Sequence, residues 1–516
     1  MKEFANEVYL DFSNPEIAQK QRQILDKVRT EFGKEYPNII NGEKVITTDK
    51  TRSINPSNLD ETIGIFQKSG KDDAEKAMQA ALTAFESWKK VPMETRAEFL
   101  FKAANVMRER RLEINAWMIS EVGKNYLEAD ADTCEAIDFL DFYGREALRY
   151  GGKQPIVPIA GENNEMIYTP LGVGVIIPPW NFPFAILAGM SAAAIVCGNP
   201  VIVKPSSDSP MMGWIFTEIM REVGLPDGVL NFLVASGAEA GDYLVTHPKT
   251  RFISFTGSME VGLRINELAA KTMKGQIWIK RVVAEMGGKD SIVVDSETNI
   301  DVAVQGVVAA AFGFQGQKCS ACSRVIVDSK IYEEFTEKLK VAVEKLQVGN
   351  PLDNTFCGPV VSAKAERSIL NYIEIGKKEG RLLTGGYKVE GKNGYYIQPT
   401  VFADISPMAR ISQEEIFGPV LAVIKSENFE DGLSIANNTI YGLTGAVYTD
   451  NKEKLAKARE EFFVGNLYLN RKCTGALVGG NPFGGFNMSG TDSKAGGRDY
   501  LLLFLQAKSI SEKIKK

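Results

Sequence analysis

Hydrophobic residues recur at helical spacing on both sides of Pro92. In residues 72–88, Met78, Leu82 and Phe85 fall on one face, and the same spacing returns in the segment ETRAEFLFKAANVMRERR. A period of three to four residues is typical of an amphipathic helix. Since proline interrupts a helix, the pattern predicts two consecutive helices rather than one.

From residue 171 onward the pattern changes to short runs of β-branched residues. The runs GVGVIIPP, NPVIVKPS, GVLNFLVAS and RFISFTGS predict strands, and helix-like segments lie between them at 184–197, 209–223 and 238–246. Strands that alternate with helices predict βαβ units and a parallel sheet.

A second region of this kind begins near residue 291. The runs SIVVD, SRVIVD and PVLAVIK predict strands, and residues 332–346 predict a helix. We therefore place a boundary near Gly287–Gly288. The Pro- and Asn-containing stretch 155–170 interrupts the first region and predicts an arm rather than a domain.

Composition narrows the classes of function. The chain has 516 residues and a formal net charge of -5, which favours two or three domains and disfavours a nucleic-acid-binding surface. Its longest apolar run, 182–197, is shorter than the ~20 residues of a membrane span, so it predicts a buried helix. The opening MKEFANEVYLDF has no signal or transit pattern, and we expect a cytoplasmic protein with no membrane partner.

Six cysteines and a single histidine, His247, limit the metal chemistry. Cys319 and Cys322 form a C-x-x-C pair, but a zinc site would need a second pair or histidines. We therefore expect no metal. His247 is also the sole imidazole that a Ser-His or Cys-His mechanism could use.

Cys319 lies in the Gly-rich, basic segment GFQGQKCSACSR, directly after an apolar run. An exposed loop, backbone N–H groups and the adjacent Lys318 would favour the thiolate. Local features leave two interpretations equally open, a nucleophile and a structural thiol. Cys322, three residues on, suggests an inhibitory disulfide with Cys319 as a further hypothesis.

Two other stretches offer partners for a thiol nucleophile. Glu285, in VVAEMGGKD, is a carboxylate at a strand end before two glycines, and these would give its side chain room to move. Asn181, in IIPPWNFPF, has an amide that could donate to an oxyanion. By itself each stretch is more typical of a surface turn.

The segment FTGSMEVG follows a predicted strand and precedes a predicted helix. Gly257 and Gly262 do not have the spacing of a dinucleotide fingerprint or a P-loop. A strand, a Gly-Ser turn and a helix N-terminus can still hold a phosphate. An ordinary turn remains the alternative.

Together these stretches resemble the aldehyde dehydrogenase superfamily. PWNFP, KPS, FTGS, EMGGK, GQKCSA and EEIFGP occur in family order over residues 178–419, and PFGGFNMSG follows. The resemblance implies an α/β fold with a Rossmann-like cofactor domain (1–154 and 171–286), a catalytic domain (287–480) and a β-arm for oligomerisation (155–170 and 498–516). A homodimer or a ring of dimers is expected.

The resemblance also implies a mechanism. Cys319 attacks the aldehyde, Asn181 and the Cys319 N–H stabilise the thiohemiacetal oxyanion, and Glu285 activates water to hydrolyse the thioester. The residues that it implies for cofactor binding are Trp180, Lys204, Ser207, Gly257, Ser258, Glu415 and Phe417. His247 has no assigned role.

Within the superfamily, FGFQGQKCSACSR and EEFFVGNLYLNRKCTGALVGGNPFGGF resemble the L-glutamate γ-semialdehyde dehydrogenases, also called 1-pyrroline-5-carboxylate dehydrogenases. These enzymes make glutamate in proline degradation. The resemblance implies that the substrate carboxylate binds Ser320, Gly475 and Ala476, with Lys318 adding charge. Phe182 and Phe483 would flank the aliphatic chain, and Glu135 would face the ammonium.

The residue after the KPS motif bears on cofactor choice. NAD-restricted relatives carry a Glu where this chain has Ser207, with Asp208 next. A carboxylate there would repel a 2′-phosphate. We expect NAD as the preferred cofactor with some use of NADP.

Three alternatives stay open at this point. The chain could oxidise another semialdehyde or aldehyde, which the Ser320, Gly475 and Ala476 site would discriminate. It could be a non-redox thiol hydrolase, although only His247 could serve as an imidazole base. It could also be a catalytically silent relative, although Cys319 and its partners are intact.

Overall fold

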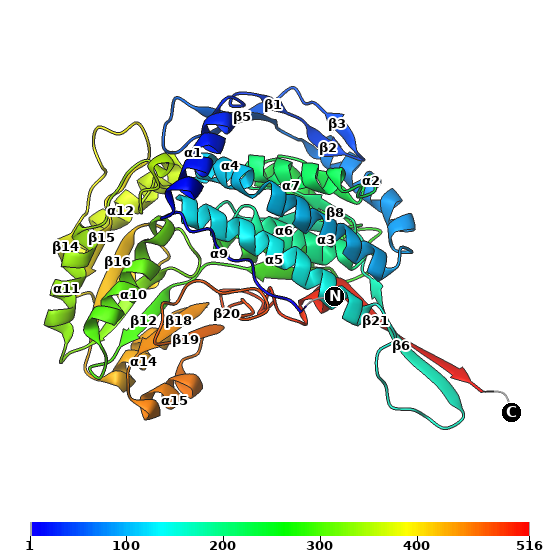
Figure 1. The fold of residues 1–516 in the computed structure, drawn as a ribbon. Helices are drawn as coiled ribbons and strands as arrows, with labels where there is room; N and C mark the ends of the chain where they lie inside the picture. Colours follow the sequence, from blue (N-terminus) through cyan, green and yellow to red (C-terminus); the bar gives the residue numbers. More distant parts are fainter. Residues whose placement is uncertain (1–2, 515–516) are drawn as a thin grey trace.

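The protein is built around two seven-stranded sheets, as seen in a computed structural model that describes residues 3–514. Figure 1 shows the sheets in separate halves of the molecule, each covered by helices. The first sheet has the order β11-β10-β7-β8-β9-β2-β3. Its strands are β2 (Asn38–Ile40), β3 (Glu43–Val45), β7 (Gly174–Ile177), β8 (Val201–Val203), β9 (Leu230–Phe232), β10 (Phe252–Thr256) and β11 (Arg281–Glu285).

The second sheet has the order β14-β15-β16-β13-β12-β18-β19. Its strands are β12 (Asp290–Val294), β13 (Cys322–Asp328), β14 (Arg381–Thr384), β15 (Thr400–Ala403), β16 (Val420–Ser426), β18 (Thr444–Tyr448) and β19 (Asn466–Leu469). All of its ladders are parallel except the one between β14 and β15. In the first sheet β7 to β11 are also parallel, so the predicted α/β class is confirmed.

The helices of the first half follow the predicted pattern with one correction. They are α1 (Pro15–Arg29), α2 (Lys71–Trp88), α3 (Met93–Glu109), α4 (Arg111–Val122), α5 (Tyr126–Tyr150), α6 (Ala185–Val196), α7 (Pro210–Glu222), α8 (Asp242–Thr246) and α9 (Met259–Ala270). Pro92 is the N-cap of α3. The correction concerns burial in α2: Met78 is buried, but Leu82 and Phe85 are half-buried, and the other buried residues of the helix are alanines and Trp88.

In the second half the helices are α10 (Ile300–Phe312), α11 (Tyr332–Glu344), α12 (Ala363–Glu379), α13 (Arg410–Gln413), α14 (Phe429–Asn437) and α15 (Lys452–Glu461). Several begin at a side-chain cap. The side chains of Asn299, Asn428 and Asn451 accept N–H groups from the first turns of α10, α14 and α15. Such caps satisfy backbone donors that have no partner inside the helix.

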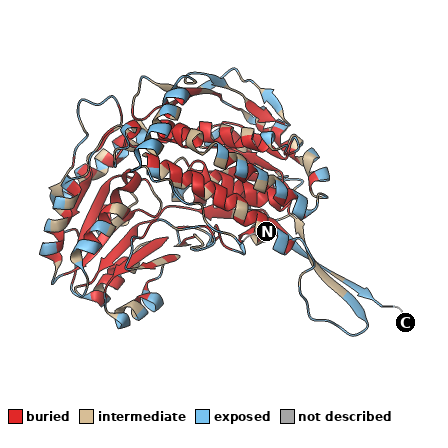
Figure 2. Ribbon diagram, in the orientation of Figure 1, coloured by how far each residue is buried: buried red, intermediate tan, exposed pale blue. Residues whose placement is uncertain are grey.

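Helix α6 is buried except at Ile186, which is half-buried (Figure 2). It is the apolar run of residues 182–197, and it packs against α5 and the first sheet. This explains why it has no polar face. Among residues 3–514 no helix is both long enough and apolar enough to cross a membrane.

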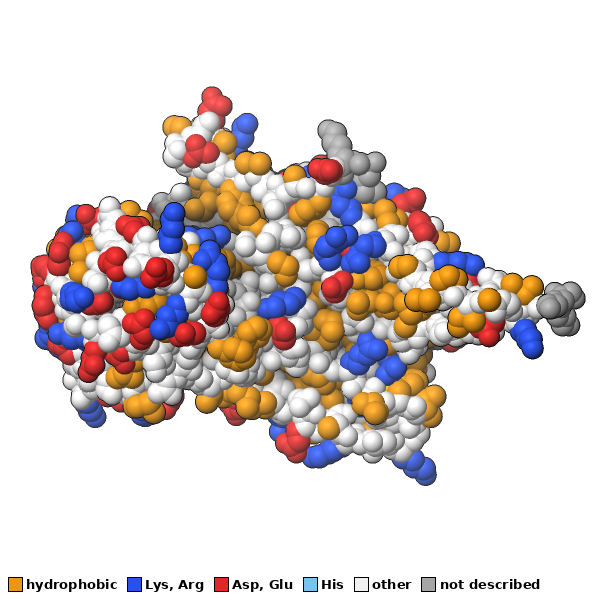
Figure 3. All heavy atoms as spheres, turned by 90° about the horizontal axis from the view of Figure 1, so that it is seen from below, with side chains coloured by type: hydrophobic (Ala, Val, Ile, Leu, Met, Phe, Trp, Pro, Cys, Tyr) orange, Lys and Arg blue, Asp and Glu red, His pale blue; other side chains and the backbone are white. Residues whose placement is uncertain are grey.

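A two-stranded arm projects from the first half (Figure 1). Strand β6 (Glu162–Pro170) pairs antiparallel with β21 (Leu505–Lys513), which joins segments more than 300 residues apart. Apolar side chains are visible along the arm and where it joins the body (Figure 3), and the adjoining segment exposes Ile156, Val157 and Ile159. Smaller sheets consist of β1 (Glu35–Tyr36), β4 (Lys50–Ile54) and β5 (Thr62–Gln67), and of β17 (Tyr441–Gly442) with β20 (Phe486–Asn487).

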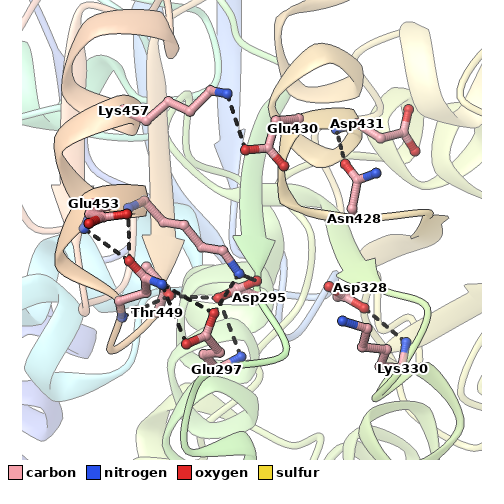
Figure 4. Close-up of polar contacts among 12 residues, drawn as sticks. Asp295, Glu297, Asp328, Lys330, Asn428, Glu430, Asp431, Thr449, Glu453 and Lys457 are labelled. Carbon is pink, nitrogen blue, oxygen red and sulfur yellow. Dashed lines mark hydrogen bonds and ion pairs between the residues drawn. The ribbon is translucent and has the colours of Figure 1, made fainter.

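The carboxyl edge of the second sheet is occupied by an ion-pair network (Figure 4). Asp295, which follows β12, accepts bonds from Lys454 Nζ of α15 at 2.7 Å and from Thr449 Oγ1 at 2.7 Å. Lys457 of α15 bonds Glu430 of α14 at 3.1 Å. The opposite charges of this network compensate one another. The other edge of this sheet, formed by the amino ends of its parallel strands, faces the carboxyl edge of the first sheet.

Candidate active site

Two cavities meet at Cys319, where the two sheet edges face each other. We call one the α5 cavity, of about 230 Å³, because helix α5 forms one wall. The other, the sheet-edge cavity, is about 720 Å³ and follows the carboxyl ends of β7, β8 and β10. Ile186, Thr256, Met286 and Cys319 line both. A thiol at this junction can be reached from either side.

The structure distributes the predicted residues between these cavities. The α5 cavity is lined by Glu135, Phe182, Glu285, Lys318, Ser320, Gly475, Ala476 and Phe483. The sheet-edge cavity is lined by Trp180, Asn181, Lys204, Ser207, Gly257, Ser258, Glu415 and Phe417. Residues from most of the length of the chain are therefore brought to one place.

A strained turn presents Cys319. Helix α10 ends at Phe312, and the 3₁₀ turn Gly313–Gly316 follows, with left-handed backbone at Phe314 (φ 48°), Gln315 (φ 55°) and Gly316 (φ 66°). A Cβ on Gly316 would lie 2.3 Å from the carbonyl oxygen of Gly418. Such strain persists only where surrounding contacts fix it. Here the Gln315 amide donates to the carbonyl of Pro359 at 2.8 Å.

A buried ion pair lies under this turn. Lys124 Nζ is 2.8 Å from Asp132 Oδ2, and both side chains are fully buried. The same ammonium lies 4.0 Å from the ring centre of Phe182 and 4.8 Å from that of Phe314. Asp132 also accepts the N–H of Ala185 at 2.6 Å. The pair thus links α5, the start of α6 and the nucleophile turn.

The expectation that Lys318 favours the Cys319 thiolate is wrong for this structure. Lys318 Nζ is 2.7 Å from Glu128 Oε1, which engages its charge. Burial raises the pKa of Cys319 well above its ordinary value, and the nearby carboxylates of Asp290, Glu285 and Glu415 raise it further. The resting residue is therefore a neutral thiol at neutral pH.

Glu285 lies at the carboxyl end of β11, in register with Thr256 of β10. Burial raises its pKa to about 7, although Ser493 Oγ donates to it at 2.6 Å and the Gly485 N–H at 3.3 Å. A carboxyl group with this pKa can exchange protons near neutral pH.

The glycines after Glu285 have a different role from the expected one. Neither Gly287 nor Gly288 has a positive φ. A Cβ on Gly287 would lie 2.1 Å from Glu415 Oε1, and one on Gly288 would lie 2.7 Å from the Cys319 carbonyl oxygen. They permit close approach of other residues rather than movement of Glu285.

Asn181 is buried beside the nucleophile turn. Its Nδ2 donates to the carbonyl oxygen of Gln317 at 3.1 Å, while Gln317 Oε1 accepts the N–H of Val361 at 2.9 Å. Asn181 is thereby held to Gln317, which lies two residues before Cys319. A stronger acceptor could replace the Gln317 carbonyl as the partner of the Asn181 amide.

Positive groups line the inner part of the sheet-edge cavity. Lys204 Nζ donates only to the carbonyls of Pro205 (3.2 Å) and Ala235 (3.3 Å), and burial lowers its pKa to about 8. Ser258 is the N-cap of α9, at the end where backbone N–H groups attract anions. Ser207 is exposed at the rim. These groups suit the hydroxyl and phosphate groups of a dinucleotide.

At the other end of this cavity Glu415 accepts the N–H of Gly288 at 3.0 Å, and burial raises its pKa to about 7. Phe417 has left-handed backbone (φ 56°) and packs edge-on against Trp180, with ring centres 5.5 Å apart. An acceptor beside an aromatic edge suits a ribose and a planar ring.

Both signs of charge line the α5 cavity. Lys318 and Lys472 lie near Ser320 and the turn at Gly475, whose φ is +80°. Glu135 faces the cavity from α5, and burial together with Asp132 raises its pKa to about 8. Carbon-rich walls from Phe182 and Phe483 complete it. This arrangement suits a small chain with a zwitterionic end.

Sequence reasoning missed several lining residues. They are Tyr9, Glu128, Asp138 and Lys472 in the α5 cavity, and Lys364 in the sheet-edge cavity. Lys472 could have been found from its place beside the predicted Gly475 and Ala476. The others come from distant helices or from the N-terminus, and no local pattern marks them.

The hypothesis of a Cys319–Cys322 disulfide gains no support from the geometry. Cys322 is buried, its thiol donates to the carbonyl of Arg324 at 3.3 Å, and it contacts the thiol of Cys473. Within residues 3–514 no cluster of three or more His, Cys, Asp or Glu side chains is arranged to hold a metal ion.

Comparison with known proteins gives consistent matches over nearly the whole chain. Residues 45–510 match the model of the Aldehyde dehydrogenase family. The 1-pyrroline-5-carboxylate dehydrogenase of Geobacillus thermodenitrificans is 55% identical over 510 residues, 99% of both chains. A crystal structure of 1-pyrroline-5-carboxylate dehydrogenase from Thermus with bound NAD has a TM-score of 0.98, 51% identity and 99% coverage of both chains.

A more distant solved structure shares the fold. Betaine aldehyde dehydrogenase from Staphylococcus aureus, in complex with NAD+, has a TM-score of 0.90 at 29% identity, covering 96% of this chain and 98% of its own. The fold is therefore shared by proteins whose names give different substrates.

The environment of Cys319 predicts selective but slow alkylation. Cys319 is half-buried and the other five cysteines are buried, so iodoacetamide should label Cys319 first. Because its pKa is raised, we expect labelling at pH 7.5 to be roughly tenfold or more slower than for an unhindered thiol, and to accelerate beyond pH 9. Peptide mass spectrometry over a pH series measures this, with Cys319→Ala as the control. Labelling that levels off below pH 8 would contradict the raised pKa.

Proposed function

The chain belongs to the aldehyde dehydrogenase family, and we propose that it oxidises L-glutamate γ-semialdehyde, the open form of 1-pyrroline-5-carboxylate, to L-glutamate with NAD. One observation carries this proposal: the α5 cavity, which ends at Cys319, is lined by both cations and carboxylates. A substrate with a carboxylate and an ammonium on its far end matches both. The names of the full-length relatives agree with this substrate.

Substrate binding uses the two charged sides of the α5 cavity. The substrate carboxylate accepts hydrogen bonds from the Ser320 hydroxyl and from the N–H groups of Gly475 and Ala476. The positive charges of Lys318 and Lys472 attract it. Successive N–H groups in a turn form a good anion site. On the opposite side, Glu135 accepts the ammonium.

The chemistry begins at Cys319. Its sulfur attacks the aldehyde carbon and forms a thiohemiacetal, while its proton leaves to a carboxylate or to solvent. The oxyanion is stabilised by the Cys319 N–H and by Asn181 Nδ2, which exchanges the Gln317 carbonyl for the more charged acceptor. NAD bound in the sheet-edge cavity would supply the acceptor for the hydride of the thiohemiacetal carbon.

Glu285 completes the reaction. A water molecule attacks the thioester carbon, and Glu285 takes its proton, so that glutamate leaves and the thiol is regenerated. Its pKa of about 7 makes it a base over the physiological range. Ser493 orients the carboxyl group by donating to Oε1.

The sheet-edge cavity fits the cofactor. Lys204 and the N-terminus of α9 at Gly257 and Ser258 would hold the ribose and phosphates, with Ser207 at the rim. Glu415 would hold the second ribose, and Phe417 and Trp180 would position the ring. We accordingly assign residues 1–154 and 171–286 to cofactor binding and 287–480 to catalysis.

We also propose that the arm mediates assembly. Residues 155–170 and 498–516 contain the β6–β21 ladder and its neighbouring segments, and apolar side chains along the arm are exposed (Figure 3). Exposed apolar surface of this kind is typical of subunit interfaces. A homodimer, or a ring of dimers, would cover it.

A substrate comparison tests the proposed function. NADH formation at 340 nm should be rapid with 1-pyrroline-5-carboxylate and much slower with propanal and succinate semialdehyde, which lack one or both charged groups. Cys319→Ala should lose roughly 10³-fold or more of the rate, whereas Cys357→Ala, in the core of the second half, should keep it. Turnover of propanal alone would leave a dehydrogenase with a different substrate.

Glu285→Gln should separate the two halves of the reaction. We expect the variant still to form NADH in its first turnover, because hydride transfer precedes hydrolysis. Its steady-state rate should then be roughly 10²-fold or more slower. In the unsubstituted enzyme the deacylation rate should rise through pH 7 as Glu285 loses its proton, and the variant should lose this rise. Stopped-flow absorbance measures both phases, with the exposed Glu374→Gln as a matched control. An unaltered steady state would exclude Glu285 as the base.

Cofactor preference should depend on Asp208. Its carboxylate lines the sheet-edge cavity beside Lys364, so it should repel a 2′-phosphate. We expect a measurable NADP rate with lower kcat/KM than NAD, and Asp208→Asn should raise kcat/KM for NADP by about fivefold. A vanishing rate at saturating NADP would contradict the dual use of cofactors.

A further inference from the structure

An extended N-terminal segment lies along α5 and forms part of the α5 cavity wall. We call residues 3–14 the N-terminal strap; it contains no helix or strand and leads into α1 (Figure 1). Asn6 Nδ2 donates to Asp138 Oδ2 at 2.9 Å and to the carbonyl of Val478 at 3.0 Å. The strap is therefore bonded both to α5 and to the loop after Gly475.

Further bonds fix the strap on either side of Tyr9. The N–H of Glu7 donates to Asp138 Oδ1 at 2.8 Å, and the N–H of Leu10 donates to Asp130 Oδ2 at 2.8 Å. Between them the carbonyl of Val8 accepts a bond from Arg111 at 2.9 Å. The backbone is therefore held on both sides of Tyr9, at Glu7, Val8 and Leu10.

Tyr9 lies at the mouth of the α5 cavity, whereas Val8 faces solvent. Val8 is 82% exposed and Tyr9 is 43% exposed, and Tyr9 lines the cavity together with Glu135 and Asp138. Burial raises the pKa of Tyr9 to about 12, and the charge of Glu135 is the next largest cause. The hydroxyl thus keeps its proton, and Tyr9 and Glu135 line the same cavity.

Glu135 needs such a donor. The carboxyl group is deeply placed and shares its surroundings with Asp132, which disfavours its ionised form. To pair with an ammonium group it must be ionised. A neutral hydroxyl that donates to a carboxylate stabilises that form without adding a competing charge.

We propose that Tyr9 is a specificity-determining residue of the α5 cavity: it closes the outer end, and its hydroxyl donates to Glu135 when that carboxylate holds the substrate ammonium. This inference rests on the proposed function, because it assumes a substrate with an ammonium group. It assigns to the N-terminal strap a part in recognition that is separate from the chemistry at Cys319.

Three variants and two substrates test it. Tyr9→Phe removes the hydroxyl, Tyr9→Ala also opens the wall, and Val8→Ala is the control on the outward face of the same strap. The substrates are 1-pyrroline-5-carboxylate and glutarate semialdehyde, which has the same chain and carboxylate without the ammonium. Binding of L-glutamate by titration calorimetry gives a readout that needs no catalysis.

For Tyr9→Phe we expect KM for 1-pyrroline-5-carboxylate and Kd for L-glutamate to rise about five- to tenfold, with kcat within twofold. KM for glutarate semialdehyde should stay within twofold, as should every parameter of Val8→Ala. Tyr9→Ala should raise KM for 1-pyrroline-5-carboxylate further.

Other outcomes would overturn the inference in distinguishable ways. An equal rise in KM for both substrates would show that the hydroxyl does not act through the ammonium, and a parallel fall in kcat and Tm would show a structural role only. No change in any variant would exclude Tyr9 from recognition. If the unsubstituted enzyme neither turns over 1-pyrroline-5-carboxylate nor binds L-glutamate, the proposed function itself fails.

Discussion

The site depends on one buried ion pair, Lys124 with Asp132. Both groups are withdrawn from water, so the charge of each is stabilised only by the other and by its remaining protein contacts. Asp132 holds the start of α6 through the N–H of Ala185, and Lys124 lies against the rings of Phe182 and Phe314. Loss of either partner would leave a buried charge between the nucleophile turn and the segment that carries Asn181. The relative position of these two reactive segments is therefore set by a charge balance beneath them.

A second constraint is the direction of the two sheets. The first sheet presents carboxyl ends to the site, where loops and helix N-termini favour anions. The second presents its amino edge, and Cys319 lies there between α10 and β13. Burial and three nearby carboxylates raise the pKa of Cys319, so the thiol stays protonated at rest. Two of these carboxylates, Glu285 in the α5 cavity and Glu415 in the sheet-edge cavity, would also favour cationic groups.

The fold was largely predictable, and the site only in part. Alternating strands and helices gave the α/β class, and the strand-end motifs placed Glu285 and Asn181 because carboxyl ends of parallel strands converge. The charge state of Cys319 was not predictable, because Lys318 is adjacent in sequence but paired with Glu128 of α5. Similarly, the glycines at 287 and 288 signal close approach of Glu415 and Cys319, and a sequence does not reveal which atoms approach. Tyr9 was missed for the same reason, as its strap is about 120 residues from the helix it meets.

In the proposed mechanism, chemistry and recognition are therefore built from different kinds of structure. Cys319, Glu285 and Asn181 lie at sheet edges or in turns held by buried bonds, where small displacements are resisted. The outer wall of the α5 cavity comes from a strap, a helix face and the loop at Gly475, which are joined mainly by Asp138 and Asn6. Such a wall can differ between relatives without disturbing the reactive groups. The fold is shared, at a TM-score of 0.90, with a betaine aldehyde dehydrogenase, whose named aldehyde has a different charged end.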